Sequence, residues 1–194
     1  MRCRRPEYTA PPVLFQHAVE QNACGRLGRL IREVAFQSCG DVPLFVNLHP
    51  EELNSRWLVR PDDPLCFHAA PVYLEITESA AFTHFDLCLS VLRELCRRTG
   101  ALLVVDDFGA GHSNLERVVN LEPSIVKLDL ALTRGIHALP RKRAVVRHVV
   151  NLCNELGARV VAEGTETIDE LSCVRALGVD YAQGYLLARA AAPP

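Results

Sequence analysis

The chain has 194 residues, of which 49% are hydrophobic and 23% charged, and its formal net charge is −2. These values are typical of a globular domain with a proper core. The small net charge argues against a surface that coats a nucleic acid polymer or a membrane, and no apolar run approaches the roughly 18 residues of a membrane span. The opening residues, MRCRRPEYTAPP, lack the apolar core of a signal peptide, so we expect a cytoplasmic protein.

Eight cysteines are scattered along the chain without a Cys-x-x-Cys pair. Most of them lie inside apolar segments. This pattern favours small buried side chains in a reducing cytoplasm over a zinc site or a disulfide framework.

The predicted elements begin with two helical patterns, at about 12–23 and 25–38. Strand-like apolar runs then alternate with helical segments. We predict strands at 44–48, 72–76, 102–106, 124–129, 159–164 and 180–187, and helices at 83–99, 141–157 and 167–177. This alternation predicts an α/β fold with a mainly parallel sheet, whose continuous Val, Ile and Leu runs fit strands buried on both faces. No linker or repeat interrupts the chain, so we expect one domain over residues 1–194.

Polar side chains recur near the C-terminal ends of the six predicted strands. In chain order these are Asn47, Glu75, the pair Asp106 and Asp107, Lys127, Glu163 and Gln183. In a (β/α)₈ barrel this end of the strands carries the active site. One such residue would mean little, but six successive strands with the same feature predict a site.

This set of side chains indicates a particular chemistry. Oxygen donors without His or Cys favour Mg²⁺ or Mn²⁺ over zinc. Asp106 and Asp107 would repel each other in a buried site unless cations compensate them. A two-metal site with a shared carboxylate would do so, and it would activate a water for displacement at phosphorus. Lys127, in a chain whose only other lysine is Lys142, suggests a compact ammonium that orients this water or stabilises developing charge.

Each residue taken alone also fits a structural role. An aspartate pair at a strand end is typical of a helix N-cap. Glu75 and Glu78 fit a capping pair, and Glu163 and Glu166 fit solvated loop charges. Asn47, before a proline-containing turn, fits an Asx turn.

Six motifs in the chain resemble those of a known family. They are FVNLHPEEL, LEITES, DDFGAGHSNL, IVKLD, VVAEGTET and DYAQGYLL, in that order. They resemble the VNLSP-type, LEITES, DDFGTGYSSL, KID, VAEGVET and QGY segments of the EAL domain, the cyclic di-GMP phosphodiesterase module of bacteria. The resemblance covers roughly residues 1–189.

The resemblance implies an incomplete TIM-like (β/α) barrel, with strands three to eight of eight present. It also implies roles for individual residues. The implied metal ligands, for two Mg²⁺ or Mn²⁺ ions, are Asn47, Glu75, Asp106 and Asp107. Lys127 and Glu163 would position or activate the attacking water.

Further residues take roles through the same resemblance. Arg2 and Gln183 are similar to substrate-binding positions. Glu78 is similar to the residue that anchors the glycine-rich loop 108–114, and we assign Glu166 a loop-anchoring role as well. The implied reaction is hydrolysis of one phosphodiester of cyclic di-GMP to linear pGpG. A homodimer and sensor or GGDEF domains outside this chain are the implied partners.

The chain also departs from the family pattern at its start. In the family signature EALxR, Met1 aligns with x and Arg2 with the arginine, while Cys3 replaces an aromatic residue. The EAL glutamate and the first two strands would precede Met1, in a longer protein or a lost segment. Three functions remain open: an active phosphodiesterase completed by upstream residues, a non-catalytic module that binds cyclic di-GMP or a protein, and a fragment with residual fold. We expect weak or no turnover from the chain alone.

Overall fold

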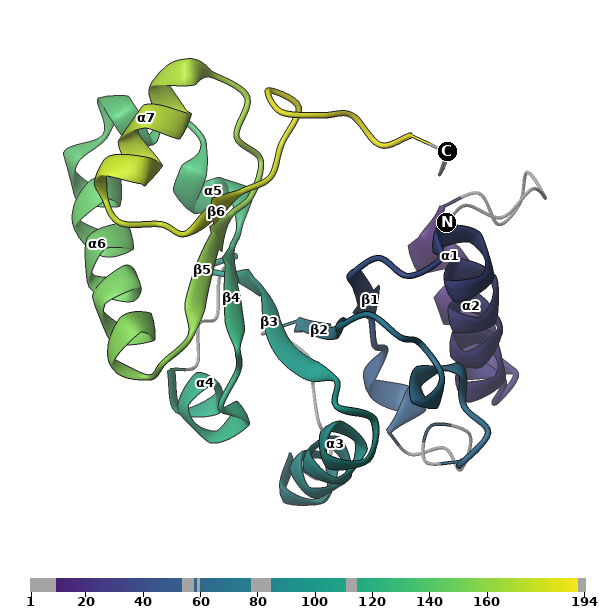
Figure 1. The fold of residues 1–194 in the computed structure, drawn as a ribbon. Helices are drawn as coiled ribbons and strands as arrows, with labels where there is room; N and C mark the ends of the chain where they lie inside the picture. Colours follow the sequence, from purple (N-terminus) through teal and green to yellow (C-terminus); the bar gives the residue numbers. More distant parts are fainter. Residues whose placement is uncertain (1–9, 54–57, 59, 78–84, 111–114, 192–194) are drawn as a thin grey trace. The chain divides into compact units, whose positions relative to one another are not determined.

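The computed structural model describes residues 10–53, 58, 60–77, 85–110 and 115–191. Figure 1 shows the course of the chain. Contacts divide it into two compact units, apart from its last two residues. The first unit comprises Met1–Leu74 and Ala81–Leu102, and the second comprises Glu75–Ala80 and Leu103–Ala192. The prediction of one domain over residues 1–194 stays a prediction.

The first unit begins with helices, as the sequence predicted. Its elements are α1 (Pro11–Glu20), α2 (Cys24–Cys39), β1 (Leu44–Asn47), the short 3-10 helices η2 (Pro50–Glu52) and η3 (Pro64–Cys66), the first half of β2 (Val72–Thr77), and α3 (Phe85–Thr99). Proline at the start of α1 needs no hydrogen-bond partner for its nitrogen, which suits a first helical position.

A buried ion network ties helix α2 to the two 3-10 helices of this unit. Arg32 Nη1 lies 2.7 Å from Glu52 Oε2, and Arg32 Nη2 lies 2.9 Å from Asp63 Oδ2. All three residues are fully buried. Gly28, one turn before Arg32, makes room for this network, because a Cβ there would lie only 1.8 Å from Glu52 Oε2. The hydrophobic pattern of the sequence does not reveal this network.

The second unit carries the remaining strands and their helices. Its elements are the second half of β2, nearly all of β3 (Leu102–Phe108), α4 (Leu115–Leu121), β4 (Ile125–Leu128), α5 (Leu130–Thr133), the 3-10 helix η4 (Ile136–Ala138), α6 (Pro140–Glu155), β5 (Arg159–Ala162), α7 (Ile168–Ala176) and β6 (Tyr181–Ala182). The short helices α4 and α5 were not predicted.

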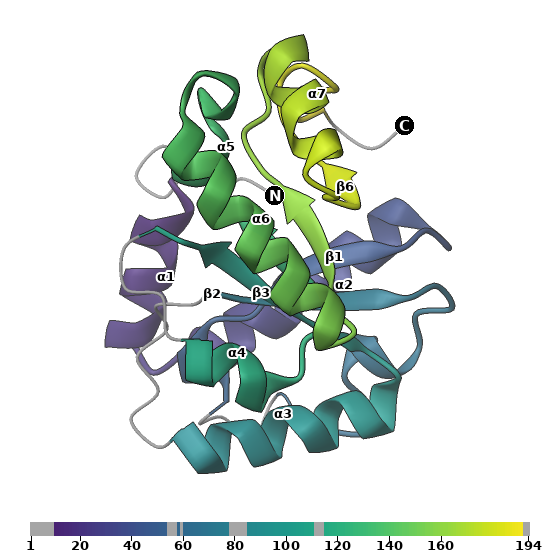
Figure 2. The ribbon, with the colours of Figure 1, turned by 90° about the vertical axis from the view of Figure 1, so that its left-hand side faces the viewer.

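The strands pair in chain order from β1 to β6. The pairs β3–β4, β4–β5 and β5–β6 are parallel, and Lys127 of β4 lies beside Val161 of β5. Helix α6 lies against β5 and buries Val146 and Val150 (Figures 1 and 2). These pairings confirm the predicted α/β organisation. They also bring the C-terminal ends of β3, β4 and β5 to one edge of the sheet.

The predicted strand at 180–187 is wrong in length, since β6 contains only Tyr181 and Ala182. The chain leaves the sheet because the next residues bond to the loop after β5 instead. Thr165 N donates to Gln183 O at 3.1 Å. Gly184 passes so close to Thr165 that a Cβ would lie 2.1 Å from the Thr165 carbonyl oxygen. The close contact between the backbones of Gly184 and Thr165 ends this strand. Such a contact leaves no trace in the hydrophobic pattern of the sequence.

The seven cysteines in the described part of the chain are free thiols. Burial raises the pKa of Cys24 to about 12 and that of Cys153 to about 11, so these thiols stay protonated near neutral pH. Among the described residues, no helix is long and apolar enough to cross a membrane.

The buried network predicts a large effect of removing its one cation. In Arg32→Met, Glu52 and Asp63 would remain buried without a counter-charge, so we expect the free energy of unfolding to fall by about 3–5 kcal/mol. Denaturant unfolding measures this. Arg97→Met is the matched control, because Arg97 is exposed and pairs with Glu94 on the surface; its stability should stay close to that of the wild type. Equal losses in both variants would contradict the network's role.

The same variant should respond to pH. Burial raises the pKa of Glu52, and Arg32 opposes that rise. Without Arg32, the folded-state pKa rises further above the unfolded value, so on acidification the folded variant takes up protons before the unfolded chain does. The stability deficit of Arg32→Met should therefore shrink between about pH 7 and about pH 5. A deficit that stays constant over this range would show that Arg32 does not lower the pKa of Glu52.

Candidate active site

Asp106 and Asp107 lie at a bulge near the end of β3. The register with β4 is regular at Val105 and resumes only at Phe108, which pairs with Leu128. Asp107 adopts a positive φ of 57°. In a regular strand, neighbouring side chains point to opposite faces, whereas a bulge re-aims one of them. The irregular backbone thus brings two adjacent carboxylates to one place.

The buried ammonium of Lys127 contacts carboxylates on β2, on β3 and directly after β5. Lys127 Nζ, near the end of β4, lies 2.7 Å from Glu75 Oε1, 2.9 Å from Asp106 Oδ1 and 2.6 Å from Glu163 Oε1. Lys127 is 5% exposed, and Glu75 is 6% exposed. Glu163 follows β5 directly, and its backbone N–H donates to Leu128 O at 3.1 Å. All these residues belong to the second unit.

Three of the carboxylates also lie close enough together to share a cation. Asp106, Asp107 and Glu163 each offer an oxygen atom within 4.8 Å of the other two. Asp106 is buried, and the other two are half-buried. The sequence predicted Glu75, Asp106, Asp107, Lys127 and Glu163 as neighbours, and the structure brings these five together.

Burial and the uneven charge balance set the pKa values here. Burial alone would lower the pKa of Lys127, but hydrogen bonds to Glu163 and Glu75 raise it, so the ammonium stays charged. Burial raises the pKa of Glu75 and that of Glu163, against the opposing effect of Lys127. Burial and the neighbouring Asp106 raise the pKa of Asp107. One ammonium therefore leaves four crowded carboxylates only partly compensated.

The loop that carries Glu163 is held by Glu170, which was not among the predicted site residues. Its Oε2 accepts hydrogen bonds from Glu166 N at 2.9 Å and from Thr167 N at 3.1 Å, and Thr167 Oγ1 in turn accepts from Glu170 N at 3.2 Å. This is a capping box at the start of α7. The Thr-x-x-Glu spacing was the available signal.

The other predicted site residues have different positions. Asn47 ends β1 in the first unit with an exposed side chain. Gln183 is exposed, and its backbone N–H donates to Ala162 O at 2.8 Å, which holds it beside the end of β5. The carboxylate of Glu166 forms an exposed ion pair with Arg134. Arg2 and Glu78 lie outside the described residues.

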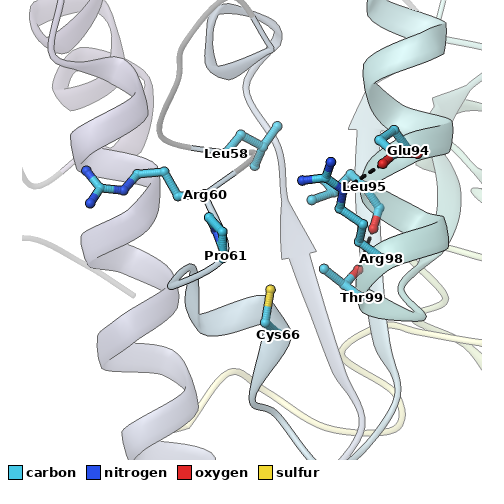
Figure 3. Close-up of a pocket in the computed structure, with 8 residues that line it drawn as sticks. All are labelled: Leu58, Arg60, Pro61, Cys66, Glu94, Leu95, Arg98 and Thr99. Atoms are coloured by element: carbon cyan, nitrogen blue, oxygen red, sulfur yellow. Dashed lines mark hydrogen bonds and ion pairs between the residues drawn. The ribbon is translucent and has the colours of Figure 1, made fainter.

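The first unit contains a small hollow of about 210 Å³ with different chemistry (Figure 3). Cys66 points into it, while Arg98 turns toward Glu94 and forms an ion pair with it at 2.6 Å. Arg60 points away from it and pairs with Asp62. The charged groups that line the hollow all form ion pairs, and carboxylates are not in excess there as they are in the second unit.

Comparison with known proteins now places the chain in a family. The sequence pattern of the EAL domain matches residues 1–190. The chain belongs to the EAL domain family. The cyclic di-GMP phosphodiesterase RocR of Pseudomonas aeruginosa is 38% identical over 152 residues, which cover 76% of this chain and 38% of RocR. The cyclic di-GMP phosphodiesterase PdeR of Escherichia coli is 34% identical over 191 residues, which cover 92% of this chain and 29% of PdeR. The chain therefore spans well under half the length of these relatives.

Solved structures show the same fold. Klebsiella pneumoniae BlrP1, in a complex with calcium and cyclic di-GMP, matches with a TM-score of 0.78 and 34% identity. The match covers 94% of this chain and 48% of the BlrP1 chain. A BlrP1 complex with manganese and cyclic di-GMP matches with a TM-score of 0.76. The predicted fold is thus confirmed: an incomplete TIM-like barrel of EAL type, in which the described residues form a six-stranded sheet.

The central ammonium should be essential for the stability of the metal-free protein. In Lys127→Met, Glu75, Asp106 and Glu163 would lose their shared counter-charge, so we expect the free energy of unfolding to fall by about 3–5 kcal/mol. Lys142→Met, a change at the other lysine, should cost less than about 1 kcal/mol. Denaturant unfolding in the presence of a chelator measures both. A smaller loss in Lys127→Met than in Lys142→Met would contradict the arrangement.

Proposed function

We propose that this chain is the phosphodiesterase part of a larger protein, and that it hydrolyses one phosphodiester bond of cyclic di-GMP to give linear pGpG. The observation that carries this proposal is the buried cluster of Asp106, Asp107, Glu163 and Lys127 in a member of the EAL family. The relatives RocR and PdeR, which bear the name cyclic di-GMP phosphodiesterase, support the substrate. The BlrP1 complexes, which contain this nucleotide, support it too.

The donor set fits divalent cations. Four carboxylates surround one ammonium, so the cluster has an excess of negative charge that burial makes unfavourable. All the predicted ligands are oxygen donors, the type that Mg²⁺ and Mn²⁺ prefer. Asp106 and Asp107, with Glu75 and Asn47, would hold two such ions. The calcium and manganese of the BlrP1 complexes support a divalent ion. Bound there, the ions would lower the pKa of a water and neutralise charge on the phosphate.

The remaining residues act on the water and the substrate. Glu163 would accept a proton from the attacking water, and Lys127, which contacts Glu163 Oε1 at 2.6 Å, would keep this carboxylate in position while remaining charged. Gln183 and Arg2 would bind the substrate. Glu78 would anchor loop 108–114, and Glu166, through its pair with Arg134, would anchor the loop that follows Glu163.

The proposed setting is cyclic di-GMP signalling in the bacterial cytoplasm. Sensor or GGDEF domains elsewhere in the protein would control the activity, and a homodimer would be the working form. The short fraction of the relatives' length that the chain covers is consistent with additional domains.

Turnover by the larger protein that contains this chain tests the proposal. With Mn²⁺ present, we expect conversion of cyclic di-GMP to pGpG. Chromatographic separation of the two nucleotides measures this conversion. Glu163→Gln removes the proton acceptor but keeps the shape of the side chain, so the rate should fall at least about 100-fold. Glu155→Gln, the same change on the exposed end of α6, should keep the wild-type rate.

Each outcome has a definite meaning. An unchanged rate in Glu163→Gln would contradict the assigned role of this glutamate. Nucleotide binding without turnover by the wild type would favour the non-catalytic binding module instead. A wild-type protein that neither binds nor hydrolyses cyclic di-GMP would overturn the proposed function.

A further inference from the structure

Three successive residues at the end of α5 contact the loop that carries Glu163 or the helix α7 that follows this loop. The hydroxyl of Thr133 donates a hydrogen bond to the backbone carbonyl of Glu163. The next residue, Arg134, forms an ion pair with Glu166. Gly135 N then donates to Glu170 Oε1 at 2.7 Å. These contacts differ in burial, since Thr133 is fully buried whereas the pair of Arg134 with Glu166 is exposed.

The contact from Thr133 completes the fixation of the Glu163 backbone. On one side of the Glu163 Cα, the N–H donates to Leu128 O, at the end of β4. On the other side, the carbonyl accepts from Thr133. The peptide groups before and after the Glu163 Cα are therefore both held by hydrogen bonds. Together they fix the direction in which the Glu163 side chain leaves the backbone. That direction places Glu163 Oε1 2.6 Å from Lys127 Nζ.

The backbone of the loop is shaped to allow this contact. Gly164 has a φ of +66°, and a Cβ there would lie 2.6 Å from the Cβ of Leu130. Helix α5 thus approaches the loop more closely than any residue with a side chain at position 164 would allow. At this separation, the short side chain of Thr133 reaches the carbonyl of the preceding residue.

We propose that Thr133 is a positioning residue for Glu163, and that it acts through the hydrogen bond to the Glu163 carbonyl. The proposal rests on the proposed function of Glu163 as proton acceptor. Thr133 touches neither water nor nucleotide in this role. Its loss would let the carbonyl turn and the Glu163 carboxylate move away from Lys127 and the reacting water.

A second buried threonine on the same loop provides the matched control. Thr165 is fully buried, but its hydroxyl has no hydrogen-bond partner among the described residues. Thr133→Val and Thr165→Val therefore make the same change in shape and polarity. Only the first of them removes a hydrogen bond to Glu163.

The test combines hydrogen–deuterium exchange with steady-state kinetics on the complete protein. In Thr133→Val we expect faster exchange of the backbone amides of residues 163–167, while the amides of β4 and α6 stay protected. The value of kcat should fall about 10–100-fold with little change in KM. Thr133→Ser, which keeps the hydroxyl, should restore both. Thr165→Val should leave the exchange of residues 163–167 at the wild-type rate or slower.

Several results would overturn the proposal. One is wild-type exchange and kcat in Thr133→Val. Another is faster exchange throughout the second unit, which would show general loss of packing, and a third is an equal effect in Thr133→Ser. If the wild type has no turnover, the proposed function fails, and exchange alone decides this inference. Faster exchange at 163–167 in Thr133→Val that Thr133→Ser reverses would then support it, and unchanged exchange would refute it.

Discussion

The organisation of the second unit depends on the burial of one ammonium among carboxylates. Removing a charge from water is unfavourable by several kcal/mol unless close partners compensate it. Lys127 finds partners on separate strands: Glu75 on β2, Asp106 on β3, and Glu163 directly after β5. Because the strands pair in chain order, these side chains lie at one edge of the sheet. The ion cluster thus requires this sheet, and it helps to hold the ends of the strands together.

The crowding of carboxylates around Lys127 is accompanied by irregular backbone conformations. Two neighbouring aspartates reach one site only because β3 bulges between Val105 and Phe108. The positive φ of Asp107 is a conformation that most residues with a side chain avoid, and such conformations occur where the surroundings enforce them. Gly164 after β5 and Gly184 after β6 permit close approaches, to Leu130 and to the Thr165 backbone, that hold Glu163 and Gln183 beside the same edge. Local irregularity is therefore what shapes the site.

The sequence predicted those features of the fold and the site that depend on the hydrophobic pattern and on polar residues at strand ends. It located the longer helices, most of the strands, and the neighbours Glu75, Asp106, Asp107, Lys127 and Glu163. It could not predict the bulge at Asp106, because the run LLVVDDF reads as a regular strand. The end of β6 and the bond from Thr133 to Glu163 depend on backbone atoms, which every sequence shares. The close approach of Gly28 to Glu52 could not be predicted from the sequence, because the two residues lie far apart in the chain and meet only when it folds.

We propose that the carboxylate excess around Lys127 forms a divalent cation site. Calorimetric titration of the metal-free protein with Mn²⁺ tests it most directly, because it requires no nucleotide and no turnover. We predict that the wild type binds Mn²⁺, that Asp106→Asn binds it at least about tenfold more weakly, and that Asp169→Asn, a change at an exposed aspartate of α7, binds like the wild type. A wild type that does not bind Mn²⁺, or an Asp106→Asn variant with undiminished affinity, would show that these carboxylates do not form a cation site.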